Sequence, residues 1–440
     1  MRLIQTIKNI AKIEDLRARI IYTLSIIALY RLGSFVTLPG VDPSQLDALR
    51  TQTEGGIMGL IDMFSGGAFS QASIFALGIM PYISASIVIQ LLAIVFPHFQ
   101  KLQKEGESGR RKMNQYTRYL TILILVLQAP SYLLNIRNVL PPSAFILTGT
   151  FFTISSVIIL TAGTMFVMWL GERITDKGIG NGISLIIMIG IIARFPESFI
   201  FEAGLRMGGS GGLVALLLEM IILYVVILGT ILLVQGTRRI PVQYARRVVG
   251  NKQFGGVRQY IPLKINAAGV MPIIFAQALM MLPIVFIGMS ETPGRILGAF
   301  TDMYGFWYNL VTALLIIAFT YFYTAITVNP VQMAEDMKKN GGFIPGIKPG
   351  RRTVEFLDGV MSKITLPGSF FLATVAILPA IAVQFGVSPL FAQFFGGTSL
   401  LIMVGVVLDT LQQIESHLLM RHYDGLMKSG RIKGRSGGGM

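Results

Sequence analysis

The sequence predicts an all-α polytopic membrane protein with ten transmembrane helices arranged as two inverted five-helix halves. Three observations support this fold class: a scarcity of charge, a series of apolar runs of spanning length, and a motif that recurs at the same place in both halves. Of the 440 residues, 53% are hydrophobic and only 13% are charged, and the mean hydropathy is +0.65. A soluble domain carries about 25% charged residues, so lipid must be the main solvent of this chain.

Ten apolar runs reach the roughly 20 residues that a helix needs to cross a bilayer. The segment before them, residues 1–19, interleaves basic and apolar residues. It is therefore predicted to be a cytoplasmic amphipathic helix at the membrane surface rather than a cleavable signal peptide. The predicted spans are residues 20–38, 72–96, 118–137, 148–170, 182–200, 213–234, 267–289, 306–328, 366–385 and 388–411.

The positive charges predict the orientation of these spans. Of the 37 Lys and Arg residues, 31 lie in the N-terminal segment, in the loops that follow the even-numbered spans, and in the basic tail 412–440. By the positive-inside rule these segments, including both termini, face the cytoplasm.

A tetrapeptide repeat indicates that the two halves are copies. Gly78-Ile79-Met80-Pro81 lies in the second span and Gly269-Val270-Met271-Pro272 in the seventh. The same offset carries the first span onto the sixth and the third onto the eighth. Because five spans is an odd number, the halves 20–200 and 213–411 must be inverted, an arrangement that usually places the working site between them at the midplane. Chance recurrence in an apolar sequence is the alternative.

A Gly-rich apolar segment, residues 55–67, lies between the first two spans and is too short to cross the membrane. Irregular backbone at membrane depth is tolerated only where it is buried in protein or lines a cavity. The segment is therefore interpreted as a re-entrant element, and the alternative is a helix in an outer loop.

Isoleucines and polar residues share one face of the second span in a definite order. Ile79, Ile83, Ser86 and Gln90 have helical spacing, with the isoleucines toward the outside and the polar residues toward the cytoplasm. The seventh and tenth spans show the same order. A ring of apolar side chains can close a pore to ions by excluding water, although each isoleucine alone could be ordinary helix packing.

The sequence contains no recognisable catalytic motif. It has no phosphate-binding loop, no His-Glu-x-x-His motif, no Cys and only three His. We therefore expect neither an enzyme nor a metal or other cofactor, and the energy for any transport must come from a partner.

Two basic cytoplasmic loops are candidates for contacting that partner, residues 235–264 and 331–364. The first is predicted to form a projecting hairpin with Arg246 and Arg247 near its tip. Basic loops of this length suit ribosomal RNA phosphates or an acidic motor surface, whereas the alternative is that the charges serve topology alone.

Three isolated charges within or near the spans receive separate interpretations. Arg31 is expected to snorkel toward the outer surface. Glu219 and Asp409 are intramembrane carboxylates and so deserve a functional hypothesis. Because both are near helix ends, we expect solvated positions for them.

Several motifs together resemble the SecY family, the channel subunits of the bacterial Sec protein translocase. They are Met63–Gly67, Ile79–Leu92, Trp169–Glu172, Gly178–Ser184, Asn329-Pro330 and Gly346–Gly350. The resemblance covers essentially the whole chain. It implies a central hourglass pore with a re-entrant plug helix at about residues 55–70. It also implies a channel in the bacterial inner membrane that passes unfolded secretory polypeptides and releases hydrophobic segments laterally into the lipid.

The resemblance implies roles for residues at four places. The implied pore ring consists of Ile79, Ile83, Ile183, Ile187, Ile274 and Ile402. The implied plug residues are Gly56, Ile57, Leu60, Ile61, Met63, Phe64, Gly66 and Gly67. The implied lateral gate, between spans two and three and spans seven and eight, includes Ser84, Ser86, Gln90, Asn266 and Gln277. The implied contacts for a motor or the ribosome are Arg238, Arg239, Arg246, Arg247, Lys348, Arg351 and Arg352.

The implied partners are SecE, usually SecG, the SecA ATPase, the ribosome, signal peptides, nascent chains and membrane lipids. Lys348 stands where the family commonly has Arg, which keeps the charge but loses the planar fork for bidentate contacts. The rival class is a secondary transporter, but such a carrier normally has a polar midplane site. A purely structural scaffold leaves the re-entrant segment without an explanation.

Overall fold

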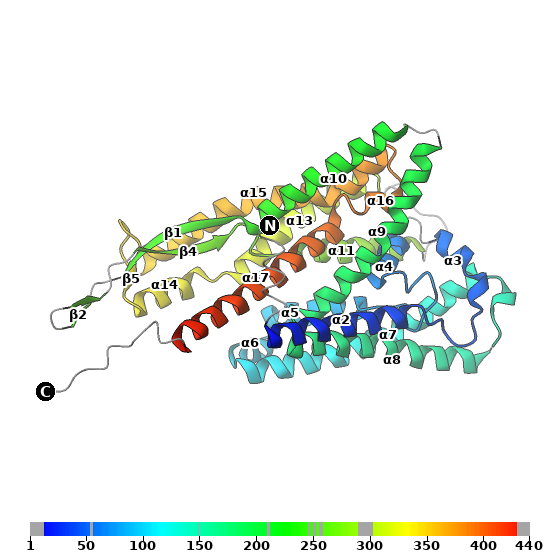
Figure 1. Ribbon diagram of the computed structural model, residues 1–440, viewed down its shortest axis with the longest axis horizontal. Coiled ribbons are helices and arrows are strands. Elements are labelled where there is room, and N and C mark those ends of the chain that lie inside the picture. The colour runs from blue at the N-terminus through cyan, green and yellow to red at the C-terminus, as the bar shows by residue number, and fades with distance from the viewer. Residues whose placement is uncertain are drawn as a thin grey trace. The chain divides into compact units, whose positions relative to one another are not determined.

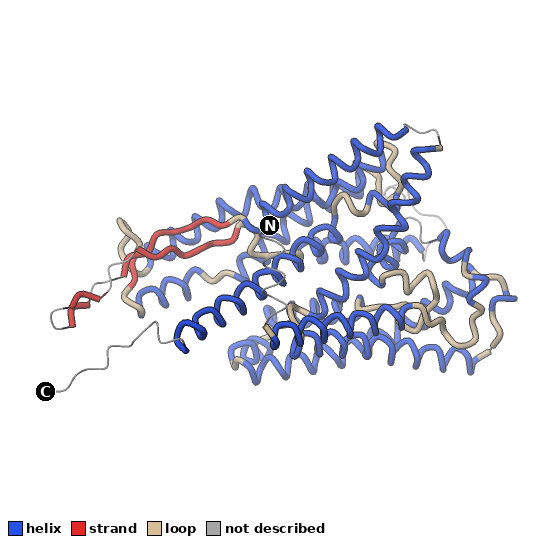
Figure 2. The backbone as a smooth tube through the Cα atoms, in the orientation of Figure 1, coloured by secondary structure: helices blue, strands red, loops and turns tan. Residues whose placement is uncertain are grey.

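The structure is a computed structural model in which helices make up most of the chain (Figures 1 and 2). It describes residues 13–52, 56–147, 149–208, 212–244, 247–249, 252–254, 258–288 and 302–428. The first twelve residues of the predicted amphipathic segment and the end of the basic tail lie outside these ranges.

The chain divides into two compact units. Unit 1 contains residues 1–196 and 406–440, and unit 2 contains residues 197–405. The inverted relationship of the two predicted halves stays a prediction.

Unit 1 is a helical bundle whose apolar core is formed by residues such as Leu49, Leu125, Tyr132, Phe152 and Leu160. The core helices α7 and α8 pack side by side, and α7 also packs against α5. The helices of this unit are α2 (Glu14–Ser34), α3 (Asp47–Gln52), α4 (Gly56–Ser65), α5 (Met80–Val95), α6 (Pro97–Lys104), α7 (Glu107–Val139), α8 (Thr150–Lys177), most of α9 (Gly182–Met207) and most of α17 (Gly397–Lys428), with 3-10 turns at Pro43–Gln45 and Pro142–Ala144.

Unit 2 combines long helices with a small antiparallel sheet. Helix α13 packs against both α11 and α15. The helices are α10 (Gly212–Gln235), α11 (Met271–Gly288), α13 (Phe306–Thr327), α14 (Pro330–Lys339), α15 (Arg351–Gln384) and α16 (Pro389–Ala392), together with the last part of α9 and the first part of α17. The strands are β1 (Thr237–Tyr244), β2 (Arg247–Val249), β3 (Lys252–Phe254), β4 (Arg258–Lys264) and β5 (Gly342–Phe343).

The predicted hairpin in loop 235–264 is confirmed. Strand β1 pairs antiparallel with β4 in a register that places Ile240 opposite Ile261, and β5 adds to the other edge of β1. Farther along the hairpin, β2 pairs with β3. Alternate residues of β1, Ile240 and Val242, are buried against Met337 of α14 and Leu357 of α15. This period of two is what a strand with one covered face requires.

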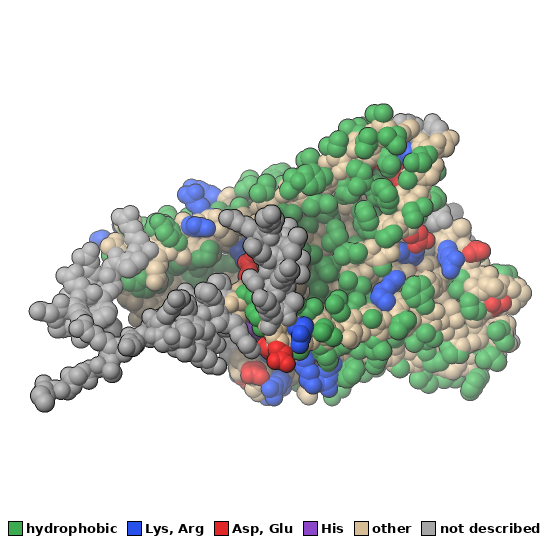
Figure 3. Space-filling view, viewed as in Figure 1, with side chains coloured by type: hydrophobic (Ala, Val, Ile, Leu, Met, Phe, Trp, Pro, Cys, Tyr) green, Lys and Arg blue, Asp and Glu red, His purple; other side chains and the backbone are tan. Residues whose placement is uncertain are grey.

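The surface of the long helices is apolar. Along α10, Val214, Leu218 and Ile221 are more than half exposed, and Figure 3 shows hydrophobic side chains over this helix. A continuous apolar surface of this kind is unfavourable in water and favourable in lipid. The protein is therefore a multi-pass membrane protein.

Within the described residues, seven helices are long and apolar enough to cross a membrane, and the bent pair Met80–Ala93 and Pro97–Gln103 would make an eighth. The count of ten spans stays a prediction. Within the predicted span 72–96 helix α5 begins only at Met80, and the predicted span 388–411 covers α16, which begins at Pro389, and the start of α17 at Gly397. Gly78 and Gly397 both have positive φ, a conformation that interrupts a right-handed helix.

Candidate functional site

The segment that was predicted to be re-entrant forms a short helix, α4, followed by a run of turns up to residue 79. The predicted plug residues Gly56, Ile57 and Leu60 lie on α4. Ile61 is partly buried, Met63 and Phe64 are buried, and Gly66 and Gly67 follow with φ of +68° and +88°. These two glycines supply the left-handed turn that reverses the chain after the helix.

Side chains from α2 and α7 hold this turn through its carbonyl groups. The Tyr30 hydroxyl donates to the Ser65 carbonyl at 3.0 Å, and Arg31 Nη1 donates to the Gly66 carbonyl at 2.6 Å. The Tyr132 hydroxyl donates to the Phe69 carbonyl at 2.9 Å. The expectation that Arg31 snorkels is therefore wrong: its guanidinium turns inward because an unpaired buried carbonyl would be costly.

Asp62 of α4 forms a buried ion pair with Arg194 of α9. One Asp62 carboxylate oxygen accepts from the Ser70 backbone amide at 2.7 Å, and Arg194 Nη2 also donates to the Ser70 hydroxyl at 2.8 Å. Asp62 is only 2% exposed. Neither residue was predicted to have a role, although a lone acidic residue in an apolar segment is a signal for a buried partner.

The isoleucines of the predicted pore ring are distributed over both units. Ile79, Ile83, Ile183 and Ile187 belong to unit 1, whereas Ile274 and Ile402 belong to unit 2. Ile79, Ile187 and Ile402 are buried, and the other three are partly buried. The ring itself stays a prediction because it combines residues from both units.

The two copies of the repeated tetrapeptide adopt matching backbone conformations. Gly78 has φ of +54° and Gly269 has φ of +64°, and a helix begins two residues later in each case, at Met80 and Met271. Proline follows as the second helical residue, where its missing amide hydrogen costs nothing. Each unit therefore contains one copy of the same helix start.

The predicted gate residues are partly buried in their respective units. On α5, Gln90 Nε2 donates to the Ser86 hydroxyl at 3.3 Å. In unit 2 the Thr398 hydroxyl donates to Gln277 Oε1 at 3.4 Å. Ser84 and Asn266 complete the predicted set, and the gate that these residues would form also stays a prediction.

The Gly-rich connection between α8 and α9 is fixed by hydrogen bonds to its backbone. The Ile179 amide donates to the Thr23 hydroxyl at 3.2 Å, and the Gly180 amide donates to Gln413 Oε1 at 2.9 Å. A Cβ on Gly182 would lie 1.9 Å from the Gly171 carbonyl oxygen, so only glycine fits there. At the end of α8, Glu172 makes a bidentate ion pair with Arg118 of α7 at 2.6 to 2.7 Å.

Glu219 is not solvated, which corrects the sequence-based expectation. It is 7% exposed and accepts from Arg206 at 2.5 Å. Arg206 also pairs with Glu202 at 2.9 Å and donates to the Gly386 carbonyl at 2.8 Å. Glu219 is near a helix end but is still buried, because Arg206 of α9 lies beside it and compensates its charge. Asp409 is exposed on α17.

The two basic loops form one module in unit 2, made of the β1–β4 hairpin, α14, β5 and the start of α15. Arg238, Arg239 and Lys348 are exposed on it, as are Arg351 and Arg352. The Thr353 hydroxyl donates to the Lys348 carbonyl at 3.1 Å and so fixes the turn before α15. Of the two predicted tip residues, Arg246 lies outside the described residues, and only the backbone of Arg247 is described, in β2. Figure 3 shows Lys and Arg side chains in blue in the region where the hairpin and α15 overlap in Figure 1.

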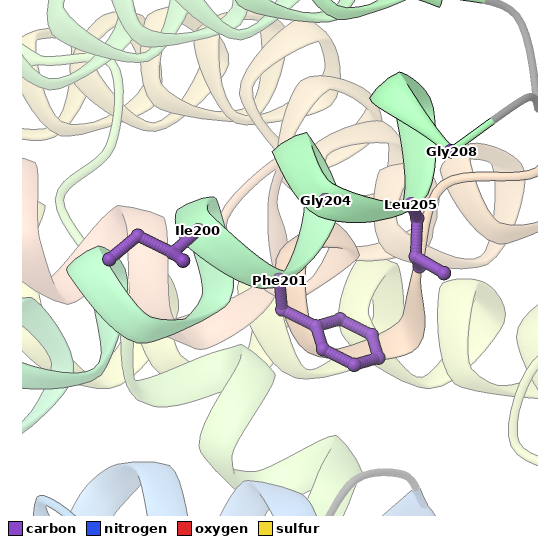
Figure 4. Close-up of a pocket in the computed structure, with 5 residues that line it drawn as sticks. All are labelled: Ile200, Phe201, Gly204, Leu205 and Gly208. Atoms are coloured by element: carbon purple, nitrogen blue, oxygen red, sulfur yellow. The ribbon is translucent and has the colours of Figure 1, made fainter.

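In the described part of the chain, no group of three or more His, Asp or Glu residues could hold a metal ion. A cavity of about 550 Å³ on α9 is lined by apolar residues and glycines only, Ile200, Phe201, Gly204, Leu205 and Gly208 (Figure 4). Such a lining offers no acid, base or nucleophile.

Comparison with known proteins decides the family. The SecY family profile matches residues 73–411. The chain belongs to the SecY family. Among its SecY relatives, the protein translocase subunit SecY of Corynebacterium glutamicum is 43% identical over 95% of this chain and 98% of its own length. The SecY of Streptomyces scabiei is 44% identical with the same coverage.

Solved structures of SecY and Sec61 channels share the fold. A structure described as a protein conducting channel matches with a TM-score of 0.62 and 19% identity, covering 91% of this chain and 92% of that chain. Canine Sec61 in a ribosome–channel complex matches with a TM-score of 0.56 and 17% identity over the same shares.

Proposed function

We propose that this SecY-family chain is the channel-forming subunit of a protein translocase. It passes unfolded secretory polypeptides across the membrane and releases hydrophobic segments into the bilayer. The chain is not an enzyme, and a partner supplies the energy. The observation that carries the proposal is 43% identity to a translocase SecY along nearly the full length of both chains.

The six isoleucines from Ile79 to Ile402 form the pore ring in this proposal. Aliphatic side chains suit this role because they exclude water from a narrow neck and yet make no specific bonds to a passing chain. Helix α4 and the turn after it form the plug that closes the outer side of the neck at rest. Its support is the burial of Met63 and Phe64 and the hydrogen bonds that hold the turn.

Lateral release depends on the hydrophobicity of the passing segment. Leu, Ile, Phe and Val favour insertion by about 0.3 to 0.6 kcal/mol each. Ten such residues contribute roughly 3 to 6 kcal/mol, whereas one central charge costs about 2.5 to 3.5 kcal/mol. For a signal sequence with ten such residues and one misplaced charge, the favourable and unfavourable insertion free energies are therefore similar in size. Small changes in its sequence then decide whether it enters the lipid or crosses the membrane. The gate between spans two and three and spans seven and eight, with Ser84, Ser86, Gln90, Asn266 and Gln277, provides the exit.

The basic module of unit 2 is the docking surface for the energy source. The SecA ATPase and the ribosome use the exposed Arg238, Arg239, Lys348, Arg351 and Arg352 in alternation, together with Arg246 and Arg247. SecE and SecG complete the complex in the bacterial inner membrane, with both termini of this chain in the cytoplasm. Canine Sec61, which shares the fold, is found in a ribosome–channel complex, and this supports the ribosome as one partner.

Site-specific crosslinking tests the proposal directly. The chain has no Cys, so Ile83→Cys, Ile187→Cys, Ile274→Cys and Ile402→Cys each introduce one reactive thiol. A secretory chain stalled in the complex and carrying a thiol-reactive crosslinker should label all four positions. The controls are Ile154→Cys and Ile221→Cys, at side chains that are 57% and 60% exposed on α8 and α10. Equal labelling of controls and ring positions would contradict the assigned pore.

A further inference from the structure

We propose that the ion pair between Asp62 and Arg194 is a latch that holds α4 in its resting position and must break before the channel opens. The inference rests on the proposed role of α4 as the plug. It adds a specific contact that sets how firmly the plug stays closed.

The charges around the turn after α4 favour this assignment. Asp62 is the only charged residue of α4, and it is almost completely buried. Arg31 and Arg194 approach the turn from two helices: a Cβ on Gly66 would lie 2.9 Å from Arg31 Nη1, and one on Gly67 would lie 3.3 Å from Arg194 Nε. Two guanidinium groups therefore lie close to the turn, and one of them is paired with Asp62. Loss of the Asp62 charge would leave both positive charges near the turn without this carboxylate.

The contacts of the turn differ in kind from those of the helix. Tyr30, Arg31 and Tyr132 donate to backbone carbonyls of the turn at Ser65, Gly66 and Phe69. These bonds can persist when α4 leaves, because they lie at or beyond its last residue. The Asp62–Arg194 pair joins a side chain of α4 itself to α9, and both partners also bond to Ser70 of the turn. Breaking the pair therefore releases α4 from α9 at the point where the helix meets the turn.

Breaking a buried ion pair from one side is costly because the remaining charge loses the opposite charge that compensated its burial. Asp62→Asn keeps the shape of the side chain but removes its charge. Arg194→Gln removes the other partner, whose side chain is 20% exposed. Either change should shift the balance toward the open state, and the double variant should shift it no further, since all three variants lose the same contact.

The experiment measures ion conductance of the resting complex in proteoliposomes without a translocating chain. Each single variant should raise the conductance about tenfold or more, which corresponds to about 1.4 kcal/mol in the preference for the closed state. The double variant should raise the conductance no more than the single variants do. The control is Asp47→Asn, which removes an exposed ion pair with Arg50 in α3 and should leave conductance at the wild-type value. Conductance at the wild-type value in either folded single variant, or additive increases in the double variant, would overturn the latch.

Deletion of residues 56–65 separates the latch from the plug itself. If the deletion raises conductance and the single variants do not, the result supports the proposed role of α4 as the plug and shows that the latch is wrong. If the deletion leaves the resting channel tight, the proposed role of α4 fails. Size-exclusion profiles and translocation of a secretory substrate check folding, and if Asp62→Asn does not fold, the result with Arg194→Gln decides.

Discussion

Gly66 and Gly190 meet backbone to backbone. A Cβ on Gly66 would lie 2.9 Å from the Gly190 Cα, and a Cβ on Gly190 would lie 3.2 Å from the Gly66 nitrogen. The turn after α4 therefore packs against α9 at a place where neither helix nor turn has room for a side chain.

Gly66→Ala should loosen this contact more than Gly190→Ala does. Gly66 has φ of +68°, and a non-glycine residue pays about 1 to 2 kcal/mol in that region in addition to the steric clash. The ion conductance of the resting channel should be higher in Gly66→Ala than in Gly190→Ala, and higher in both variants than in wild type. Gly204→Ala, at a glycine with no heavy atom within 4 Å of an added Cβ, is the control. The opposite ranking would mean that the contact does not contribute to closure.

Polar substitutions in the pore ring should make the resting channel leak. Ile83→Ser and Ile187→Ser would let water enter the neck, and each charge that crosses 100 mV represents about 2.3 kcal/mol, so ions would follow. Conductance of proteoliposomes under an applied potential measures the leak. Ile192→Ser changes a 39% exposed residue of the same helix α9 and should have no effect. Unchanged conductance in both pore variants would mean that the neck lies elsewhere.

Arg206→Gln should destabilise unit 2 more than Glu219→Gln does. Loss of Arg206 leaves two buried carboxylates, Glu202 and Glu219, without their cation, at a cost of about 3 to 5 kcal/mol. Loss of the Glu219 charge leaves Arg206 paired with Glu202, so the cost should be about 1 to 3 kcal/mol. Thermal unfolding of the purified complexes gives the order of destabilisation. Equal decreases in melting temperature for the two variants would show that Glu202 does not compensate the Arg206 charge when Glu219 is neutral.

Arg238→Ala combined with Arg239→Ala should slow motor-driven translocation without lowering stability. Both side chains are exposed on β1, so they contribute charge rather than core packing. Loss of two charges should reduce the association rate about tenfold at low salt, and the difference should shrink as salt rises. ATP-dependent translocation across a salt series measures this effect. Lys101→Ala, at an exposed residue of α6, is the matched control, and a salt-independent defect would argue against electrostatic docking.

Local sequence patterns were sufficient to predict much of the fold. The apolar runs predicted the long helices, two β-capable stretches around Gly250-Asn251 in loop 235–264 predicted the hairpin, and the Gly-x-Met-Pro repeat predicted a recurring element. The repeat proved to be a helix start, with Gly78 and Gly269 in the same conformation. These features depend on nearby residues, whose spacing is visible in a linear sequence.

The buried ion pairs could not be predicted in the same way. Asp62 and Arg194 are far apart along the chain, and neither has a local motif that identifies its partner. Arg31 and Glu219 were expected to reach water because each is near a helix end. Both instead find partners on other segments, Gly66 and Arg206. Such pairings depend on how helices pack, and one sequence does not specify that.

The shared core of the basic module has a mechanical consequence. Ile240, Leu263, Met337 and Leu357 pack together, so the hairpin, α14 and the first turns of α15 cannot shift separately without opening that core. Helix α15 continues from this core along its full 34 residues. A protein that binds the hairpin therefore also holds α14 and the first turns of α15, so a push or twist delivered at the basic surface acts on all three elements together. It reaches the rest of α15 only through Pro367 and Pro379, where the helix lacks a backbone hydrogen bond.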